Sequence, residues 1–379
     1  MERGTSVLSQ YGTEEVLLKD NANRIERLAK DGTLPPGDLI ELLRTVGHEG
    51  EKQTHRVPWM KCTEDEAALY EAALSVREKI YGREVYLRGL IEFTNYCRND
   101  CRYCGIRRSN RELDRYRLSE EEILACCRQG HALGFRTFVL QGGEDMHYTT
   151  EDICRLLSQI KAEFPDCAVT LSIGERSRSD YAAFHEAGAE RYLLRQETSD
   201  PSHYRYLHPE PLTIENRKRC LDDLKDLGYQ VGCGIMIGSP GQTWANIAED
   251  LYYMRAFGPQ MIGIGPFIPH RDTPFKDAPA GTLEDTLHLL AVIRLMVPHV
   301  LLPATTALGT IHPFGREMGI LAGANVVMPN LSPTGVRDKY LLYDGKICTG
   351  DEAAECRGCM ERRIALTGYE VMMSRGDPR

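Results

Sequence analysis

Residues 84–104 read EVYLRGLIEFTNYCRNDCRYC, and this stretch joins the two features that together predict the fold. Its first part, 84–94, is a mainly apolar run of the kind that forms a buried strand. Its second part places Cys97, Cys101 and Cys104 directly after that strand with the spacing C-x3-C-x2-C. A parallel barrel carries its functional groups at the carboxyl ends of its strands. The stretch therefore predicts a barrel with its chemistry at this end.

Further short apolar runs alternate with helical patterns along the chain. We expect strands at 136–141, 167–173, 190–195, 230–237, 260–266, 299–306 and 324–328. We expect helices at 119–133, 151–164, 178–187, 214–227, 243–257, 283–297 and 314–322. Strands that are each separated by a helix or a longer crossover predict an α/β protein with a (β/α)8 TIM-type barrel. A doubly wound open sheet is the alternative, because periodicity alone does not exclude it.

Three segments follow from this pattern. Residues 1–82 are expected to form an N-terminal helical extension, in which Thr63 and Glu66 form a capping box at the start of a helix over 64–81. Residues 83–330 form the expected barrel, and 331–379 form a C-terminal segment that carries cysteines. We expect the end of the chain, from residue 367, to be frayed.

The composition limits the partners and the location. The 379 residues include 46 Lys+Arg and 55 Asp+Glu, a net charge of −9, without the basic footprint of a nucleic-acid partner. No apolar run is long enough to cross a membrane, and the first residues lack the apolar segment of a secretory signal. The 13 cysteines are expected to be reduced thiols, so a cytoplasmic location is predicted.

The three-cysteine loop is one ligand short of a closed site. A [4Fe–4S] cluster normally takes four thiolates, so three protein ligands leave one iron with an open coordination position. An open position on a metal is typical of catalysis rather than of a structural site. The alternative is a zinc site that takes its fourth ligand from elsewhere in the chain, because the loop contains no histidine.

With Tyr103 between the last two cysteines, the loop resembles the signature of the radical S-adenosylmethionine (SAM) enzymes. The resemblance implies a [4Fe–4S] cluster on Cys97, Cys101 and Cys104 and SAM on the open iron. It also implies that the reduced cluster cleaves the sulfonium and yields a 5′-deoxyadenosyl radical. The cofactor carries this chemistry, and the protein supplies orientation and exclusion of water.

Further stretches fit the same superfamily. "QGGED" at 141–145 resembles the motif that meets the methionyl amine, and "GIMIGSPGQT" at 234–243 resembles the region near the adenine. Arg217 is either a clamp for a carboxylate or a solvated helix residue. The resemblance implies that SAM is bound by Tyr103, Gln141, Gly142, Gly143, Glu144, Ser172, Arg195, Glu197 and Arg217.

Longer strings, among them "VTLSIGER", "YLLRQETSDPSHYRYLHP" and "MIGIGPFIPHRDTPF", resemble the HydE family, the radical maturases of [FeFe]-hydrogenase. The likeness extends over 84–363. It implies a radical enzyme that acts on a small cysteine-bound iron carbonyl–cyanide precursor and leads toward a dithiolate-bridged di-iron unit. Other hydrogenase maturases and an electron donor are the implied partners. A methylornithine synthase-like mutase, with an amino-acid-derived substrate, and a non-catalytic iron–sulfur carrier are the alternatives.

The pattern of the first strand points Arg88 and Glu92 into the barrel, if the opposite face meets the helices. A buried guanidinium needs a partner, which is either an interior acid such as Glu92 or an anionic substrate group. The resemblance implies a substrate cavity that is lined by Arg88, Thr170, Ser172, Thr305, Thr306, Tyr340 and Tyr343. Met261 and Met328 are expected as apolar walls, with ordinary core packing as the alternative.

A second cysteine group, Cys348, Cys356 and Cys359, has the spacing C-x7-C-x2-C. Zinc is a competing metal for such a site. The family resemblance favours an accessory [2Fe–2S] or [4Fe–4S] cluster, which we expect near the barrel surface, far from the radical, and dispensable for the chemistry.

Overall fold

A ring of parallel strands forms the centre of the protein in the computed structural model, which describes residues 20–350 and 353–379 without the side chains of 354 and 356. The strands of the ring are β3 (Glu84–Leu87), β4 (Gly89–Thr94), β5 (Thr137–Gly142), β6 (Ala168–Ser172), β7 (Arg191–Leu193), β8 (Gln230–Cys233), β9 (Met236–Ile237), β10 (Met261–Ile262), β11 (Gly265–Pro266) and β12 (Val326–Val327). β10, β8, β7, β6, β5 and β4 form one parallel sheet in that order.

The ring is closed through short contacts on its other side. Leu301 bridges to Met261 and Pro303 to Val326, both in parallel, and these residues supply the seventh strand. β12 then pairs in parallel with β3, and Leu90 bridges to Asn330. The expected (β/α)8 barrel is therefore confirmed. The open doubly wound sheet is excluded by this closure.

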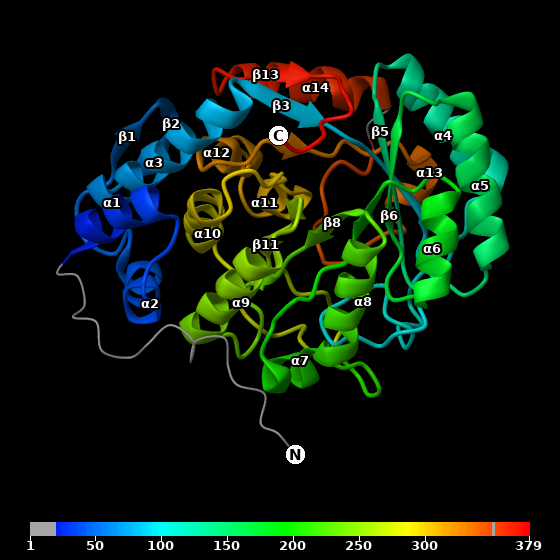
Figure 1. The fold of residues 1–379 in the computed structure, drawn as a ribbon, viewed down its shortest axis with the longest axis horizontal. Coiled ribbons are helices and arrows are strands. Elements are labelled where there is room, and N and C mark those ends of the chain that lie inside the picture. Colours follow the sequence, from blue (N-terminus) through cyan, green and yellow to red (C-terminus); the bar gives the residue numbers. More distant parts are fainter. Residues whose placement is uncertain (1–19, 351–352) are drawn as a thin grey trace.

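Helices cover the outside of the ring (Figure 1). They are α4 (Glu120–Ala132), α5 (Thr150–Glu163), α6 (Arg178–Glu186), α8 (Ile214–Asp226), α9 (Trp244–Phe257), α10 (Leu283–Met296) and α12 (Gly315–Leu321), with the shorter α7 (Pro201–Leu207), α11 (Thr306–Ile311) and α13 (Thr334–Arg337) between strands and helices. Local sequence sets where several of them begin. Ser119 caps α4 and Thr149 caps α5, each in a capping box with the residue three positions later.

Two expected strands are interrupted at glycines. The expected strand 230–237 divides into β8 and β9 at Gly234, and 260–266 divides into β10 and β11 at Gly263. The two glycine backbones lie so close that a Cβ on Gly234 would sit 2.0 Å from the carbonyl oxygen of Gly263. The sequence pattern does not reveal this approach, because it depends on how the two strands meet in space.

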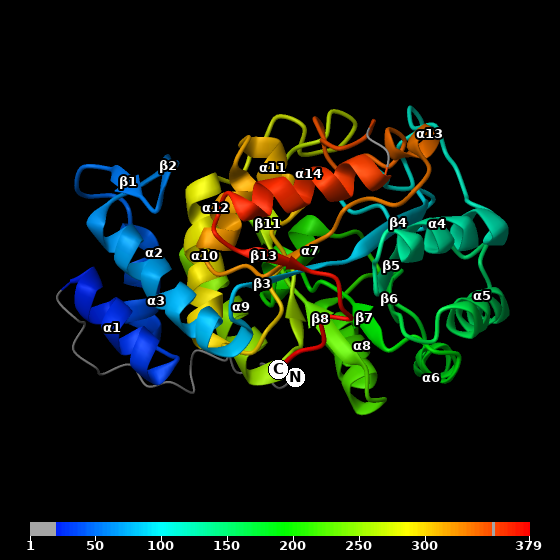
Figure 2. The same cartoon turned by 90° about the horizontal axis from the view of Figure 1, so that it is seen from above.

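The N-terminal extension consists of α1 (Asn21–Asp31), α2 (Pro36–Thr45) and α3 (Glu64–Tyr81), and it packs beside α10 (Figure 2). The prediction that this extension is helical throughout is wrong, because β1 (Gln53–His55) and β2 (Val57–Cys62) form an antiparallel hairpin. Trp59 of the hairpin stacks on Phe314, with ring centroids 4.8 Å apart. This long-range contact explains why local helical propensity was misleading there.

The C-terminal segment contains α14 (Ala353–Ala365) and β13 (Glu370–Met372). β13 pairs in parallel with β3, with Glu370 opposite Glu84 (Figure 2). The expectation of a frayed end is wrong: the residues after β13 bond to the amino ends of the barrel strands, as with Arg191 and Asp377 at 2.7 Å.

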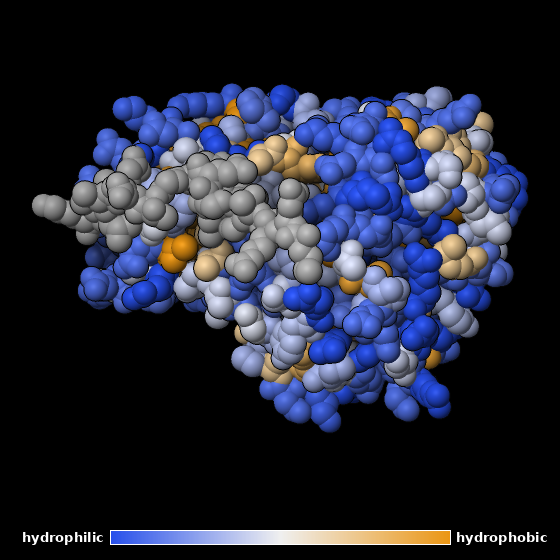
Figure 3. Space-filling model, turned by 60° about the horizontal axis from the view of Figure 1, so that its bottom comes forward, coloured by the Kyte–Doolittle hydropathy of each residue, from blue (hydrophilic) through white to orange (hydrophobic). Residues whose placement is uncertain are grey.

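The surface is mainly hydrophilic on the face that Figure 3 shows, where hydrophobic side chains lie in separate small groups. Met146, Tyr206, Leu366 and Met372 are the large hydrophobic side chains that are exposed among the described residues. Within residues 20–350 and 353–379, no helix combines the length and the apolar character that crossing a membrane requires.

Candidate active site

The cysteine loop after β4 is shaped by the chain itself. The side-chain amide of Asn95 donates to the carbonyl oxygens of Asp114 at 2.9 Å and Lys339 at 2.8 Å. Arg115 donates to the carbonyl oxygens of Ile106 and Arg107 at 2.9 and 2.6 Å. These bonds join the loop to residues 114–115 and to Lys339, so the chain itself helps to set the course of the loop.

Burial disfavours free thiolates in this loop. It raises the pKa of Cys97, and it raises that of Cys104 to about 12. Burial also raises the pKa of Cys101, and the neighbouring Cys104 and Cys97 add to this effect. Thiolates at such positions need a cation to stabilise them, and a metal ligated by sulfur supplies that charge. The loop therefore fits an iron–sulfur cluster with three protein ligands.

The two glycines of the "QGGED" stretch let the cysteine loop pack on the end of β5. A Cβ on Gly143 would lie 2.2 Å from the carbonyl oxygen of Tyr96 and 2.7 Å from Cβ of Cys97. A Cβ on Gly142 would lie 2.7 Å from Cγ2 of Thr94. Larger side chains are excluded at both positions, so the glycines bring the first cysteine against the second strand.

A cavity of about 350 Å³ opens at the carboxyl ends of the strands beside this loop. The three cysteines and every residue that the sequence assigns to SAM line it: Tyr103, Gln141, Gly142, Gly143, Glu144, Ser172, Arg195, Glu197 and Arg217. The expected substrate residues Met261, Thr305, Thr306, Met328, Tyr340 and Tyr343 line it as well. The structure thus brings residues from all parts of the barrel to one site.

Glu144 is buried and already bonded within the chain. Its carboxylate accepts a bond from Arg98 at 2.9 Å and one from the backbone N–H of Glu175 at 3.0 Å. The next residue, Asp145, points elsewhere and pairs with Arg117 at 2.7 Å. Of the two acids in the stretch, only Glu144 faces the cavity.

Arg217 is held by Glu175, an acid that no sequence pattern predicted at the site. Nε of Arg217 donates to Glu175 at 2.7 Å, and Nη1 donates to the carbonyl oxygen of Arg195 at 3.0 Å. Both Arg217 and Glu175 are buried, so Arg217 is not a solvated helix residue. Glu175 lies in the quoted string "VTLSIGER", but no spacing rule pointed to it.

Arg195 and Glu197 form an ion pair of 2.9 Å at the cavity wall. Burial raises the pKa of Glu197, although the charges of Arg195 and Arg217 oppose the increase. Glu197 also has φ of 65°, a left-handed conformation that is uncommon for a residue with a side chain. Strained backbone of this kind is concentrated at functional sites.

Two residues that line the cavity have buried polar atoms without partners. The hydroxyl of Thr305 and Nε of Arg195 are both buried and make no hydrogen bond. On the opposite wall, Gln141 donates to the hydroxyl of Tyr340 at 3.3 Å. Buried polar atoms without partners are costly, so the first two are positioned for a bound polar ligand.

A buried ion pair between Glu92 and Lys346 forms another part of the wall. Nζ of Lys346 lies 2.7 Å from Oε1 of Glu92 and also donates to the carbonyl oxygen of Tyr340 at 2.9 Å. Asn330 donates to the same carboxylate at 2.8 Å. The strand pattern places Glu92 inside the barrel, but no pattern predicted Lys346, which lies far away in the chain.

Two expected substrate residues do not line the cavity. Arg88 is buried beneath it, donates to Sδ of Met261 at 3.1 Å and has no bond to Glu92. Thr170 is fully buried, and its hydroxyl has no partner. Both residues point into the barrel below the cavity, because they lie nearer to the amino ends of their strands than the residues that line it.

The second cysteine group lies behind a wall of this cavity. Cys348 and Cys359 line a small adjoining space with Arg316, whose Nη2 lies 3.0 Å from Sγ of Cys348. Leu90, Glu92, Thr306, Met328 and Lys346 line both spaces. Cys348 and Cys359 are thus closer to the main cavity than expected, while the side chain of Cys356 lies outside the described part.

Comparisons with known proteins agree with this geometry. Residues 91–253 match the model of the Radical SAM superfamily. The chain is 46% identical over 301 residues to the "[FeFe] hydrogenase maturase subunit HydE" of Thermotoga maritima, covering 79% of this chain and 86% of that protein. It is 33% identical over 304 residues to the 3-methylornithine synthase of Methanosarcina barkeri, covering 80% and 84%.

Among solved structures, a methylornithine synthase (PylB) has a TM-score of 0.78 at 27% identity, covering 92% of this chain and 97% of that one. Membership of the radical SAM superfamily implies a [4Fe–4S] cluster and SAM, and the three buried thiols at the cavity fit the cluster. The identity to the Thermotoga maritima protein extends over most of both chains. The chain therefore belongs to the HydE family of the radical SAM superfamily and is a radical SAM enzyme.

Proposed function

We propose that this enzyme matures the active-site cluster of [FeFe]-hydrogenase. Its substrate would be a small cysteine-bound iron carbonyl–cyanide precursor, which it leads toward a dithiolate-bridged di-iron unit. The observation that carries the proposal is the 46% identity to the HydE of Thermotoga maritima over 86% of that protein. The other hydrogenase maturases and an electron donor are the proposed partners, in a reducing cytoplasm.

The residues that line the cavity would have different roles in binding the cluster and SAM. Cys97, Cys101 and Cys104 would hold the [4Fe–4S] cluster, which with SAM supplies a 5′-deoxyadenosyl radical when both are bound. SAM would be bound by Tyr103, Gln141, Gly142, Gly143, Glu144, Ser172, Arg195, Glu197 and Arg217. The Arg217–Glu175 pair would keep the guanidinium in place, since two bonds fix its plane.

The substrate would lie on the far side of the cavity, against Thr305, Thr306, Tyr340 and Tyr343. The unpartnered Thr305 hydroxyl would bond to a polar group of the substrate. Met261 and Met328 would form apolar walls of the cavity. The closed barrel would contain the radical, because an alkyl radical reacts with whatever C–H group lies close to it. Arg88 and Thr170 would not contact the substrate from their places beneath the cavity.

A second cluster is proposed at Cys348, Cys356 and Cys359, as an accessory site of the [2Fe–2S] or [4Fe–4S] type. Its support is the placement of Cys348 and Cys359 around one small space. Arg316 beside Cys348 would stabilise a thiolate or a negatively charged cluster there. The site adjoins the main cavity but contributes none of the residues assigned to SAM.

A methylornithine synthase-like mutase is the second candidate, because the 33% identity and the TM-score of 0.78 favour a related pocket. The carrier hypothesis is set aside, since the chain belongs to a family of enzymes. A mutase would need an amino acid as substrate, whereas a maturase would leave free amino acids unchanged.

An in vitro hydrogenase maturation assay tests the proposal, first without this protein and then with the reconstituted holoenzyme. We expect hydrogenase activity only when the protein is restored. The same preparation, incubated with SAM, reductant and free amino acids, should form no 3-methylornithine. Formation of 3-methylornithine without any gain in hydrogenase activity would establish the mutase in place of the maturase.

A further inference from the structure

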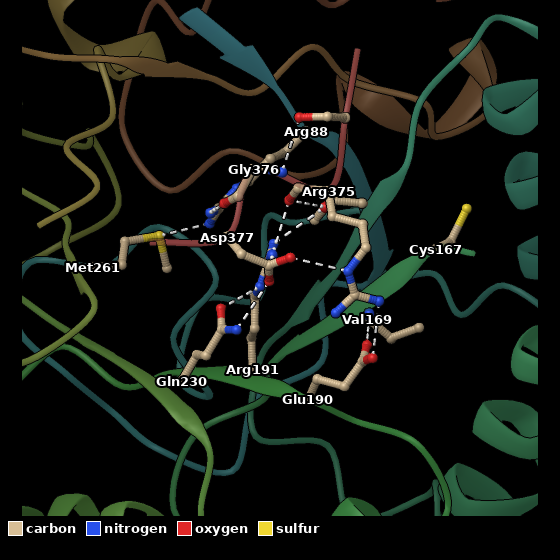
Figure 4. A network of polar contacts seen from close by, with 12 residues as sticks. Arg88, Cys167, Val169, Glu190, Arg191, Gln230, Met261, Arg375, Gly376 and Asp377 are labelled. Atoms are coloured by element: carbon tan, nitrogen blue, oxygen red, sulfur yellow. Dashed lines mark hydrogen bonds and ion pairs between the residues drawn. The ribbon is translucent and has the colours of Figure 1, made fainter. Parts of the chain in front are cut away.

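Residues near the end of the chain, among them Arg375 and Asp377, bond to the amino ends of barrel strands (Figure 4), whereas the cavity opens at the carboxyl ends. Thr137 and Arg191 are the first residues of β5 and β7, and both donate to the carbonyl oxygen of Arg375 at 2.8 Å. Gln230, the first residue of β8, donates to Asp377 at 2.9 Å. The tail, defined as residues 374–379, therefore covers the amino ends of several strands.

Asp377 and the tail carbonyls satisfy the buried guanidinium of Arg191. Arg191 is 2% exposed and donates to Gln230 and Thr137 as well as to the tail. Its Nη2 lies 2.7 Å from Oδ1 of Asp377. A guanidinium taken out of water needs a charged partner, and among the described residues Asp377 is the acid that bonds to it.

Arg88 is a second buried cation beside the first. It is 1% exposed, and it donates to the carbonyl oxygen of Gly376 at 3.1 Å and to Sδ of Met261 at 3.1 Å. Burial lowers the pKa of Arg88, the charge of Arg191 lowers it further, and Asp377 opposes both. The tail thus gives a carboxylate to Arg191 and a carbonyl oxygen to Arg88, and Arg375 of the tail bonds to the same carboxylate and to Glu190.

Gly376 fits the tail to the barrel at its closest point. It has φ of 57°, and a Cβ there would lie 2.8 Å from Cγ of Tyr86 in β3. Any other residue would be strained in this conformation, and its Cβ would also clash with the aromatic ring of Tyr86. The tail is seated tightly enough to require a glycine, so it is part of the barrel wall rather than a loose end.

We propose that the amino end of the barrel contains a carboxylate-binding site, made by Arg191 and Gln230, and that the tail occupies it with Asp377 while Arg88 binds the neighbouring carbonyl oxygen of Gly376. The occupied site closes this end of the radical chamber. It also positions Arg88, which holds Met261 in the floor of the cavity through the contact with its sulfur. Arg88 is then a positioning residue that acts on the cavity from below.

Chemical rescue of the reconstituted holoenzyme tests the site. Asp377→Ala leaves a hole the size of a carboxylate next to Arg191, and we expect the Tm to fall by about 3 °C. Acetate should restore the Tm of this variant and leave the parent protein unchanged. Glu370→Ala is the matched control, because Glu370 lies in the same segment but is exposed. A lowered Tm that acetate does not restore would overturn the carboxylate site.

The methyl resonance of Met261 tests the coupling to the cavity, which overall stability does not report. Methionine labelled with ¹³C at the methyl group gives one signal per residue, and Met261→Leu assigns this one. In Asp377→Ala the Met261 signal should shift and return with acetate, while that of Met60 in β2 stays in place. Asp377→Asn serves if the alanine variant does not fold. A Met261 signal that stays unchanged in the soluble variant would overturn the positioning role.

Discussion

Thr305 and Arg195 at the carboxyl end of the barrel differ from Arg191 at the amino end in whether the chain satisfies their buried polar atoms. The hydroxyl of Thr305 and Nε of Arg195 belong to residues that line the cavity, and both atoms are without partners. At the amino end, Arg191 finds bonds for its donors in Gln230, Thr137 and the tail, although Nε of Arg88 beside it has no partner. A buried polar atom that the chain leaves unpaired is free to bind a ligand, whereas one that the chain satisfies closes the structure. The difference separates the reactive end from the sealed end.

The largest effect is expected when a cysteine ligand of the [4Fe–4S] cluster at the carboxyl end of the barrel is removed. Cys101→Ala removes one of three ligands, and we expect formation of 5′-deoxyadenosine from SAM to fall to the background of a protein-free sample. Cys154→Ala in α5 removes a thiol away from the cavity and should retain the parent activity. Chromatography of the anaerobic, reduced reaction gives both rates. Substantial 5′-deoxyadenosine from Cys101→Ala would contradict the assignment of the three ligands.

The Glu92–Lys346 pair is the exception at the open end, because there the chain satisfies its own buried charges. Lys346→Met leaves a carboxylate buried without its cation, and we expect a loss of about 3–5 kcal/mol of unfolding free energy. Adding Glu92→Gln should recover much of this loss. Lys339→Met is the control, since Lys339 pairs with the exposed Asp114 and should cost less than about 1 kcal/mol. Urea unfolding measures all four proteins, and equal losses in both lysine variants would contradict the prediction.

Replacement of Arg217 tests whether a side chain at the cavity that is already bonded within the chain also binds SAM. Arg217→Lys keeps the charge but loses the planar fork, and we expect the Kd for SAM to rise about tenfold, as the loss of one charged hydrogen bond implies. Equilibrium dialysis of the holoenzyme provides the Kd. Arg219→Lys in the same helix, where Arg219 pairs with Asp223 on the surface, should leave the Kd unchanged. An unchanged Kd for Arg217→Lys would remove Arg217 from the cofactor site.

Acidification should weaken the sealed end. Burial raises the pKa of Asp377, but bonds from Gln230, Arg191 and Arg375 outweigh it and hold the pKa below its ordinary value of 3.8. The ionised carboxylate therefore contributes stability above about pH 4. This contribution is lost as the pH falls further, through the pKa of the folded protein. The Tm difference between the parent and Asp377→Asn should be present at pH 6 and shrink below pH 4. A difference that is constant with pH would contradict the ion pair.

The smallest effect is expected for the second cysteine group, which adjoins the open end without supplying the residues assigned to SAM. Replacement of Cys348, Cys356 and Cys359 by Ala should leave the rate of 5′-deoxyadenosine formation and the yield of the maturation assay at parent levels. The iron content per chain should fall at the same time. Lost maturation in a variant that keeps its first cluster would give this site a role in the reaction.

Local sequence predicted those parts of the molecule that depend on neighbours in the chain. The strand 84–94, the capping box of Thr63 and Glu66 and the three-cysteine loop all follow from local sequence. The hairpin at β1 and β2 was missed, because Trp59 finds its partner Phe314 far along the chain. Glu175 was missed for the same reason, since its importance rests on the bond to Arg217.

The sequence by itself determined the alternation that builds a barrel and the spacing of three thiols that leaves an iron position open. Both are periodic or local patterns, which a chain carries without folding. Only the tertiary structure decided which buried charges meet, as when Lys346 reaches Glu92 and the tail reaches Arg191. Such pairs join residues that are far apart in the chain, and each buried charge needs its partner because the closed barrel has removed both from water.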